Sequence, residues 1–311
     1  MKRLLISAVI NTLNEEKNLP RCLDSVKGLA DEIVVVDMYS DDKTAEIARQ
    51  YQASLFFHKR TGYVEPARNF AINKAKGRWV LILDADEKIS RSLSRRLRKI
   101  AQEETKFDCV LIPRKNIIFG KWMKNSRWWP DYLPRFFKKG KINWPKQIHK
   151  QPDLSGRMIY TLPDVEKFSI VHYNYDRLEQ FLRRGEKYAQ VQAVELVKEK
   201  SYKFSSKDLL LKPLEEFLSR FFPGEAYKDG VHGLALSLLQ AWVVLLVYLK
   251  VWEMRKYEQK ILERNRIKET FKEMVYQLEY WRDDFLVKNS VSSLALVSKI
   301  VLKLRAWLIR L

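Results

Sequence analysis

The chain has 311 residues, of which 46% are hydrophobic, and its formal net charge at pH 7 is +20. This length suffices for one large domain with an appendage or for two domains, and the charge favours polyanionic partners: nucleic acid, anionic lipid headgroups or phosphate-bearing substrates. Two cysteines and four histidines are too few for a disulfide framework or a Cys-rich zinc site, so a reducing, cytosolic setting is the simplest expectation.

The first third of the sequence alternates strand and helix patterns. Strands are predicted at residues 4–10, 32–37, 53–58 and 80–83, and helices at 18–28, 45–51 and 65–76. Residues 1–11 superficially resemble a signal peptide, but the apolar part is short and lacks a cleavage-type ending, so we interpret it as the first strand. Alternating units of this kind predict an α/β domain, with a mostly parallel sheet flanked by helices.

Polar side chains follow the ends of these strands, where ligands bind in such folds. They are Thr12, Asn14 and Glu15 after the first strand, Asp37 at the end of the second, and Asp84 and Asp86 at the end of the fourth. The last two carboxylates, two residues apart, could converge on one Mg²⁺ or Mn²⁺ ion that carries a diphosphate. Each residue alone could instead be a cap or a surface residue. No Gly-x-Gly-x-x-Gly or Gly-Lys-Ser/Thr loop is present, which argues against a dinucleotide fold or a P-loop enzyme.

Four segments, residues 8–26, 34–44, 67–71 and 83–87, resemble in order and spacing the motifs of family 2 glycosyltransferases with the GT-A fold (a Rossmann-like sheet). The resemblance implies a nucleotide-diphosphate sugar donor and a divalent metal ion. The implied donor-binding residues are Thr12, Asn14, Glu15, Asp37, Asp42, Arg68 and Asp84. The implied metal ligands are Asp86 and, again, Asp84. Met38-Tyr39 replaces a Ser-Gly pair that is usual in the family.

Residues 117–137 combine aromatic and cationic side chains, which suits a glycan or lipid-linked acceptor, although a packed aromatic core is an equal alternative. Asp131, followed by Arg135, resembles the acidic acceptor-side motif of the family and is the candidate general base; a purely structural Asp131–Arg135 pair is the alternative. His149 resembles the histidine of lipopolysaccharide-core-type members and could reach the metal, but Lys150 stands where those proteins carry glutamate. His172 is predicted to be a core or wall residue.

The remainder of the sequence predicts helices, so we expect a catalytic domain at residues 1–175 and a helical, membrane-associating region at residues 176–311. Residues 230–249 lack Lys, Arg, Asp and Glu and could span a bilayer or lie in its interface. Residues 291–311 form a cationic amphipathic pattern typical of binding to an anionic membrane surface; a buried helix or a homo-oligomer contact is the alternative.

These features together predict an inverting, metal-dependent hexosyltransferase on the cytoplasmic face of the cell membrane, which adds a sugar to a lipid-linked or cell-envelope glycan such as lipopolysaccharide. Transfer directly to a polyprenyl phosphate is the main alternative, since an ionised acceptor needs no base. A catalytically silent scaffold of the same fold is a second alternative. A nucleic-acid-binding function is disfavoured because no recognised reader motif accompanies the charge.

Overall fold

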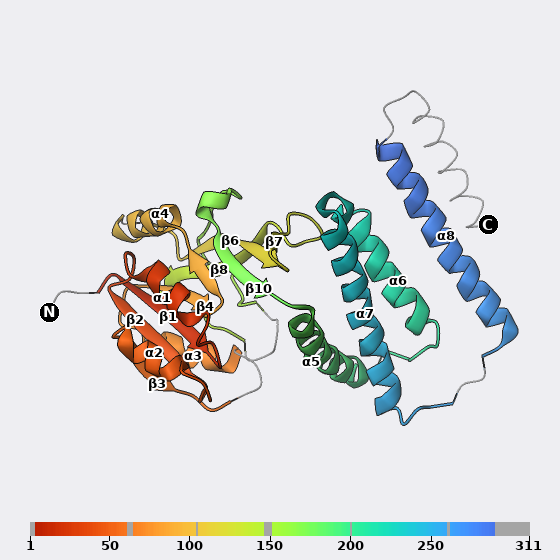
Figure 1. Ribbon diagram of the computed structural model, residues 1–311, viewed down its shortest axis with the longest axis horizontal. Helices are drawn as coiled ribbons and strands as arrows, with labels where there is room; N and C mark the ends of the chain where they lie inside the picture. Colours follow the sequence, from red (N-terminus) through yellow and green to blue (C-terminus); the bar gives the residue numbers. More distant parts are fainter. Residues whose placement is uncertain are drawn as a thin grey trace. The chain divides into compact units, whose positions relative to one another are not determined.

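The computed structural model describes residues 4–60, 65–103, 105–145, 151–199, 201–259 and 262–289. The chain divides into two compact units. Residues 1–122 and 128–176 contain most of the predicted catalytic domain and are called the catalytic unit, and residues 123–127 and 177–311 are called the helical unit. The short segment 123–127 thus belongs to the helical unit although its neighbours in sequence belong to the catalytic unit. Figure 1 shows the strands of the first unit and the long helices of the second.

The catalytic unit is built on one sheet with strand order β3-β2-β1-β4-β8-β6-β10-β5, and with β7 and β9 paired to β6. The strands are β1 Ile6–Thr12, β2 Glu32–Asp37, β3 Ser54–Phe57, β4 Trp79–Asp84, β5 Glu87–Ile89, β6 Cys109–Ile118, β7 Lys121–Trp122, β8 Asp131–Lys138, β9 Ile159–Thr161 and β10 Ile170–Tyr175. The first four are mutually parallel, whereas β8 is antiparallel to β4 and to β6. The predicted α/β fold is confirmed, as a mixed sheet.

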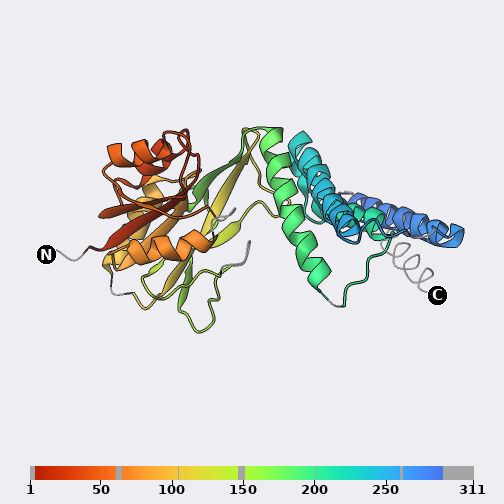
Figure 2. The same cartoon turned by 90° about the horizontal axis from the view of Figure 1, so that it is seen from below.

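Helices cover both faces of this sheet (Figure 2). They are α1 Leu19–Val26, α2 Thr44–Gln50, α3 Glu65–Lys74 and α4 Arg91–Gln102, with a short 3₁₀ turn, η1, at Glu166–Phe168. Buried residues of α1, α2 and α4 form one apolar cluster with the sheet, and those of α3 form a second cluster on the other face. Between α3 and β4, Gly77 approaches β1 so closely that an added Cβ would lie 2.6 Å from the Ser7 nitrogen. This contact requires glycine, and it holds the chain against β1 just before β4 begins.

Several elements of this unit were not predicted from the sequence, namely the strands β5, β7, β8 and β9 and the helix α4. The β8 strand contains Pro134, and proline ordinarily argues against a central strand because it cannot donate to the ladder. The structure accommodates it at a β-bulge, where Val110 pairs with Phe136 and Leu111 with Pro134. Arg135 is therefore the extra residue of the bulge, a position at which a side chain can be re-aimed.

The helical unit consists of α5 Leu178–Lys198, α6 Asp208–Phe221, the 3₁₀ turn η2 Ala226–Asp229, α7 Val231–Met254 and α8 Arg264–Asn289. The predicted helical region is confirmed. Helix α7 packs against both α5 and α6, and it begins so close to η2 that a Cβ on Gly233 would lie 1.7 Å from the Ala226 carbonyl oxygen. The buried Asp229 carboxylate accepts the Asn125 backbone N–H at 2.9 Å, which ties segment 123–127 to this unit.

Among the residues that the structure describes, α7 is the one helix long and apolar enough to cross a membrane, with a mean hydropathy of 2.0 over its most apolar window. Only 22% of that window is buried, which is little for the core helix of a globular unit. Val231, Leu234 and Leu238 share its outward face and are 81%, 40% and 53% exposed. Residues 291–311, predicted to bind a membrane surface, lie outside the described residues.

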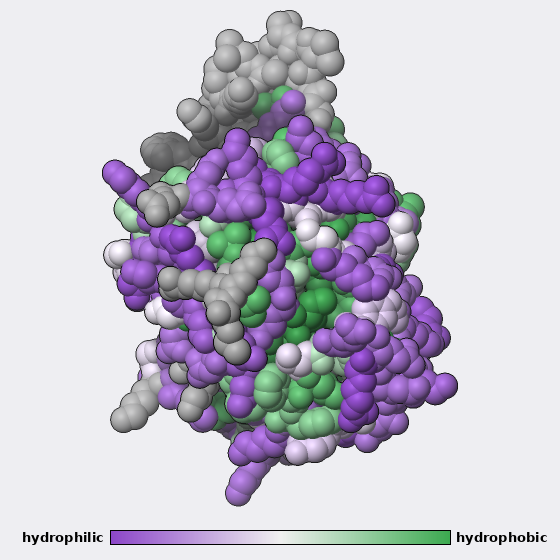
Figure 3. Space-filling view, turned by 90° about the vertical axis from the view of Figure 1, so that its left-hand side faces the viewer, coloured by the Kyte–Doolittle hydropathy of each residue, from purple (hydrophilic) through white to green (hydrophobic). Residues whose placement is uncertain are grey.

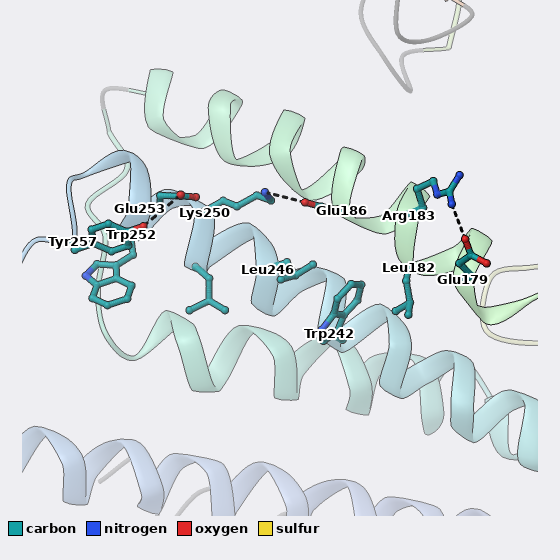
Figure 4. Close-up of a pocket in the computed structure, with 11 residues that line it drawn as sticks. Glu179, Leu182, Arg183, Glu186, Trp242, Leu246, Lys250, Trp252, Glu253 and Tyr257 are labelled. Carbon is teal, nitrogen blue, oxygen red and sulfur yellow. Dashed lines mark hydrogen bonds and ion pairs between the residues drawn. The ribbon is translucent and has the colours of Figure 1, made fainter. Parts of the chain in front are cut away.

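A groove of about 670 Å³ runs between α5 and α7 (Figure 4). Leu182, Trp242 and Leu246 are among its apolar lining residues. Ion pairs stand at its edge, between Arg183 and Glu179 at 2.6 Å and between Lys250 and Glu186 at 3.9 Å. The molecular face in Figure 3 is mostly covered by hydrophilic side chains, which surround a smaller hydrophobic area near its centre.

Candidate active site

Asp84, at the end of β4, lies between two arginines. Arg68 of α3 donates to its Oδ1 at 2.8 Å, and Arg135 of β8 donates to its Oδ2 at 2.6 Å. Burial alone would raise the pKa of Asp84, but the Arg135 and Arg68 guanidinium groups hold that pKa far below its ordinary value. Asp84 is therefore a permanently ionised carboxylate whose two oxygens both accept hydrogen bonds from arginine.

Glu87, the third acid after β4, is fully buried and forms the centre of the ionic network. Its carboxylate accepts the Asp84 backbone N–H at 2.9 Å, Arg135 Nη2 at 3.0 Å and Arg114 Nη1 at 3.4 Å. Burial would lower the pKa of Arg135, but Asp84 and Glu87 raise it above its ordinary value. The re-aimed Arg135 and the buried Glu87 together fix the turn that carries the two aspartates.

Asp86, also buried, faces His172 of β10, with 3.5 Å between its Oδ2 and His172 Nε2. The other ring nitrogen, Nδ1, lies 2.7 Å from Oδ1 of Asn116 in β6. The Asn116 amide nitrogen donates to the Trp128 carbonyl at 2.9 Å, which fixes the orientation of the amide. Since Asn116 Oδ1 can only accept, Nδ1 of His172 carries a proton. Nε2, the other ring nitrogen, is the one that faces the Asp86 carboxylate.

Asp131, at the start of β8, pairs with Arg114 of β6. Its Oδ2 accepts from Arg114 Nε at 2.8 Å and Nη2 at 2.6 Å, and from Asn116 Nδ2 at 3.2 Å. Burial would lower the pKa of Arg114, but Asp131 and Glu87 raise it. Arg135, four residues further along β8, bonds to Asp84 and Glu87 instead. The two residues of the predicted acceptor-side motif thus join the same network through different partners.

The second strand ends in Asp37, whose buried carboxylate accepts the Ser40 N–H at 3.1 Å and the Ser40 hydroxyl at 2.5 Å. Thr12 is paired with Asp37 in the parallel register, so both side chains lie on one face of the sheet. Among the described residues, the buried Thr12 hydroxyl has no hydrogen-bond partner. This hydroxyl is one polar group at the edge of β1 and β2 that a ligand could engage.

Three further predicted donor-site residues, Asn14, Glu15 and Asp42, join the loops after β1 and β2. Asn14 Oδ1 accepts the Asp41 N–H and the Glu15 N–H donates to the Thr44 hydroxyl, both at 2.8 Å. Asp42 Oδ1 accepts from the same hydroxyl at 2.5 Å. In this structure these contacts shape the loops.

Tyr39 occupies the position at which the family usually has glycine, and its φ of 57° lies in the left-handed region that glycine favours. The backbone turn is therefore retained despite the substitution. The ring is 58% exposed and stacks on Phe57 with 5.3 Å between ring centroids. The predicted residue His149 lies outside the described residues.

The sequence patterns did not single out Arg114 or Asn116, and they assigned His172 to the core or wall. Arg114 and Asn116 are two residues apart on β6, so their side chains share one face of the sheet, and this polar spacing within an apolar strand is the signal that sequence alone offers. The strand register brings these two residues to their partners, because Arg114 pairs with Asp131 and Asn116 pairs with His172 across neighbouring strands.

The network carries four carboxylates and three guanidinium groups, a net charge of −1 if His172 is neutral. They are Asp84, Asp86, Glu87 and Asp131, with Arg68, Arg114 and Arg135. Within the described parts of the chain, no three acidic, histidine or cysteine side chains form a metal-binding group. The Asp86–His172 pair nevertheless fits a divalent ion, since carboxylate oxygen and imidazole nitrogen are both ordinary metal ligands and the two groups face each other at 3.5 Å.

Comparisons with known proteins identify the family. Residues 7–159 match the family described as Glycosyl transferase family 2, and the chain belongs to that family of enzymes. An uncharacterised glycosyltransferase of Rickettsia typhi is 29% identical over 261 residues, which cover 80% of this chain and 87% of the relative.

Two solved structures are similar at lower identity. S. aureus TarS 1–349 in complex with UDP-GlcNAc is 18% identical with a TM-score of 0.45, over 83% of this chain and 93% of that one. The mannosyltransferase PcManGT from Pyrobaculum calidifontis, in complex with GDP-Man and Mn²⁺, is 17% identical with a TM-score of 0.43, over 89% and 86% of the two chains. These neighbours bind nucleotide sugars, and the second also binds Mn²⁺.

Proposed function

We propose that this glycosyltransferase is inverting and metal-dependent, and that it binds its nucleotide-diphosphate sugar where β1, β2 and β4 end. The observation that carries the proposal is the chain of side-chain contacts Asp86–His172–Asn116–Asp131, which joins a cation-binding pair to a carboxylate positioned by Arg114. An inverting transferase needs these two components, one for the departing diphosphate and one for the acceptor proton.

The nucleoside end of the donor is assigned to the loops after β1 and β2. Tyr39 offers an exposed ring on which a nucleobase can stack, and the Asp37 carboxylate and Thr12 hydroxyl lie at the same edge of the sheet. Arg68 and Arg135, which hold Asp84, supply positive charge on this side for the phosphate groups. Asp84 then acts by positioning these two guanidinium groups.

Asp86 and His172 would hold the divalent ion, Mg²⁺ or Mn²⁺. The ion supplies Lewis-acid neutralisation of the charge that develops on the leaving diphosphate. Both metals ordinarily take several further oxygen ligands from substrate and water, so two protein ligands are an adequate share. Direct ligation by Asp84, the other predicted ligand, would require it to exchange an arginine contact for the metal.

Asp131 is the proposed general base. Arg114 and Asn116 both donate to its Oδ2, so Oδ1 is the oxygen left for the acceptor hydroxyl. As that hydroxyl oxygen attacks C1 of the sugar, its proton passes to Oδ1, the new C1–O bond forms and the bond from C1 to the diphosphate oxygen breaks. This single displacement inverts the configuration at C1.

Purified full-length protein with Mn²⁺ should be screened against nucleotide sugars by thermal stabilisation, which reports ligands that bind the folded state. For the donor found, we expect Asp86→Ala to abolish metal-dependent binding and turnover, and Asp131→Asn to bind the donor but fail to transfer the sugar. Asp153→Asn, at an exposed loop carboxylate, is the control. Donor binding that is unaffected by Asp86→Ala would sink the metal assignment. Transfer that survives Asp131→Asn would favour an ionised polyprenyl phosphate as acceptor.

We propose a lipid-linked or envelope glycan as acceptor, and the cytoplasmic membrane face as the place of action. On the acceptor side, the Trp122 ring lies edge-on to Trp129 at 5.2 Å, with Lys115 above it at 4.4 Å, an arrangement suited to sugars and anionic groups. In the helical unit, the outward face of α7 is apolar and little buried, and a bilayer would cover it.

The membrane proposal is tested by co-sedimentation with vesicles that contain anionic lipid. Leu238→Glu, on the outward face of α7, should reduce binding strongly, whereas Val165→Glu, at a partly exposed residue of the catalytic unit, should not. Unchanged vesicle binding together with loss of a dimer in Leu238→Glu would identify this face as a contact between copies of the chain and refute the membrane assignment.

A further inference from the structure

We propose that Asn116 is a positioning residue that couples the general base to the cation-binding pair. This inference rests on the proposed function. Asn116 is fully buried, its Nδ2 donates to Asp131 Oδ2 at 3.2 Å, and its Oδ1 accepts from His172 Nδ1 at 2.7 Å. One side chain therefore contacts both the proposed base and a proposed metal ligand.

The orientation of this amide is set by its surroundings. Nδ2 faces two groups that only accept, the Trp128 carbonyl at 2.9 Å and the Asp131 carboxylate. A flipped amide would place its carbonyl oxygen against both of them and leave two donors toward His172. The amide therefore requires a proton on His172 Nδ1, and Nε2 is the ring nitrogen that faces Asp86 at 3.5 Å.

The strand register explains why asparagine occupies this position. Asn116 is paired with His172 in the parallel register of β6 and β10, and Arg114, two residues earlier, is paired with Asp131 in the antiparallel register of β6 and β8. Asn116 thus lies between the two groups, and because it is buried, water cannot readily take over its hydrogen bonds. Asp131 Oδ2, held from both sides, keeps its other oxygen directed to the acceptor.

The first test needs no variant. In ¹⁵N-labelled wild-type protein without metal, the His172 ring should show a protonated, pyrrole-type Nδ1, and addition of Mg²⁺ should shift the Nε2 resonance. A ring protonated on Nε2 alone would overturn the inference whether or not the protein proves to be a metal-dependent transferase.

The second test compares Asn116→Ala with Asn69→Ala. Asn69 is a matched control, because it also makes two side-chain hydrogen bonds, to the Trp144 backbone at 2.7 and 2.9 Å, but contacts neither Asp131 nor His172. Loss of an outer-shell partner typically weakens metal binding by about 10- to 100-fold. We expect a fall of that size in Mn²⁺ affinity, measured by electron paramagnetic resonance, in Asn116→Ala and not in Asn69→Ala.

The two proposals fail in different ways. If wild-type protein binds no Mn²⁺, the metal assignment fails while the tautomer measurement still decides the role of Asn116. If the wild type binds Mn²⁺ and His172→Ala abolishes binding, but folded Asn116→Ala binds as tightly as the control, the positioning role is refuted and the metal site stands. A variant that fails to fold leaves the wild-type ring spectrum as the deciding observation.

Discussion

Replacing Glu87 with alanine should destabilise the catalytic unit by about 3–5 kcal/mol, the range for breaking a buried ion pair from one side. Glu87 has no exposed surface, and its carboxylate accepts hydrogen bonds from the Asp84 N–H and from the guanidinium groups of Arg135 and Arg114. Arg114 retains Asp131 and some solvent access. The Asp84 amide and the buried Arg135 lose an acceptor, at about 1–3 kcal/mol each, so the sum agrees with the range.

Equilibrium urea unfolding of the full chain measures this change. Asp24→Ala is the control, because the Asp24–Lys27 pair at 3.0 Å is mostly exposed and such pairs contribute about 0–1 kcal/mol. Glu87→Gln, which retains an acceptor oxygen but not the charge, should fall between the two variants. If Glu87→Ala unfolds within about 1 kcal/mol of Asp24→Ala, the ionic network does not stabilise the unit as reasoned.

Three further predictions concern other parts of the chain. The pKa of Asp84 is lower in the folded than in the unfolded state, so the stabilisation by its carboxylate is present at neutral pH and is lost as the pH falls through the acid range. Asp84→Asn should therefore lose less unfolding free energy than wild type between neutral pH and about pH 3, and an equal loss in the two proteins would contradict this. Burial raises the pKa of Cys22 well above its ordinary value and that of Cys109 to about 12. A thiol reagent such as DTNB should therefore modify both only after unfolding, and fast labelling of the native protein would show that the two thiols are not buried. Gly233→Ala should lower the stability of the helical unit by at least the roughly 1–3 kcal/mol of an overpacked core, whereas Gly28→Ala, with no atom within 4 Å of the new Cβ, should not. Thermal unfolding followed by circular dichroism compares the two variants, and equal melting temperatures would refute the clash.

The donor half of the site was predictable because it depends on local patterns. Asp37 and Asp84 each follow a run of apolar residues that identifies a strand, and parallel strands bring such ends to one edge of a sheet. The resemblance of four segments between residues 8 and 87 to family 2 motifs indicated the family correctly. What these carboxylates contact was not predictable, since Asp84 binds arginines from α3 and from β8.

The remaining contacts of the site depend on strand register, which sequence does not determine. Asp131, Arg114, His172 and Glu87 come from β8, β6, β10 and β5, four neighbouring strands whose order in the sheet differs from their order in the chain. A shift of one residue in any pairing would turn the side chains of that strand to the other face. The β-bulge at Arg135 is a similar case, since Pro134 makes the segment look unlike a central strand.

The sequence by itself determined the α/β class, the family, the helical C-terminal region and most of the charged residues of the site, because apolar periodicity and strand-end carboxylates are local properties. Only the tertiary structure decided that Glu87 and Arg114 join Asp84 to Asp131, and that Asn116 stands between Asp131 and His172. Those pairings depend on long-range registers and on one bulge. Their physical origin is the packing of the whole sheet, which no short segment of the chain contains.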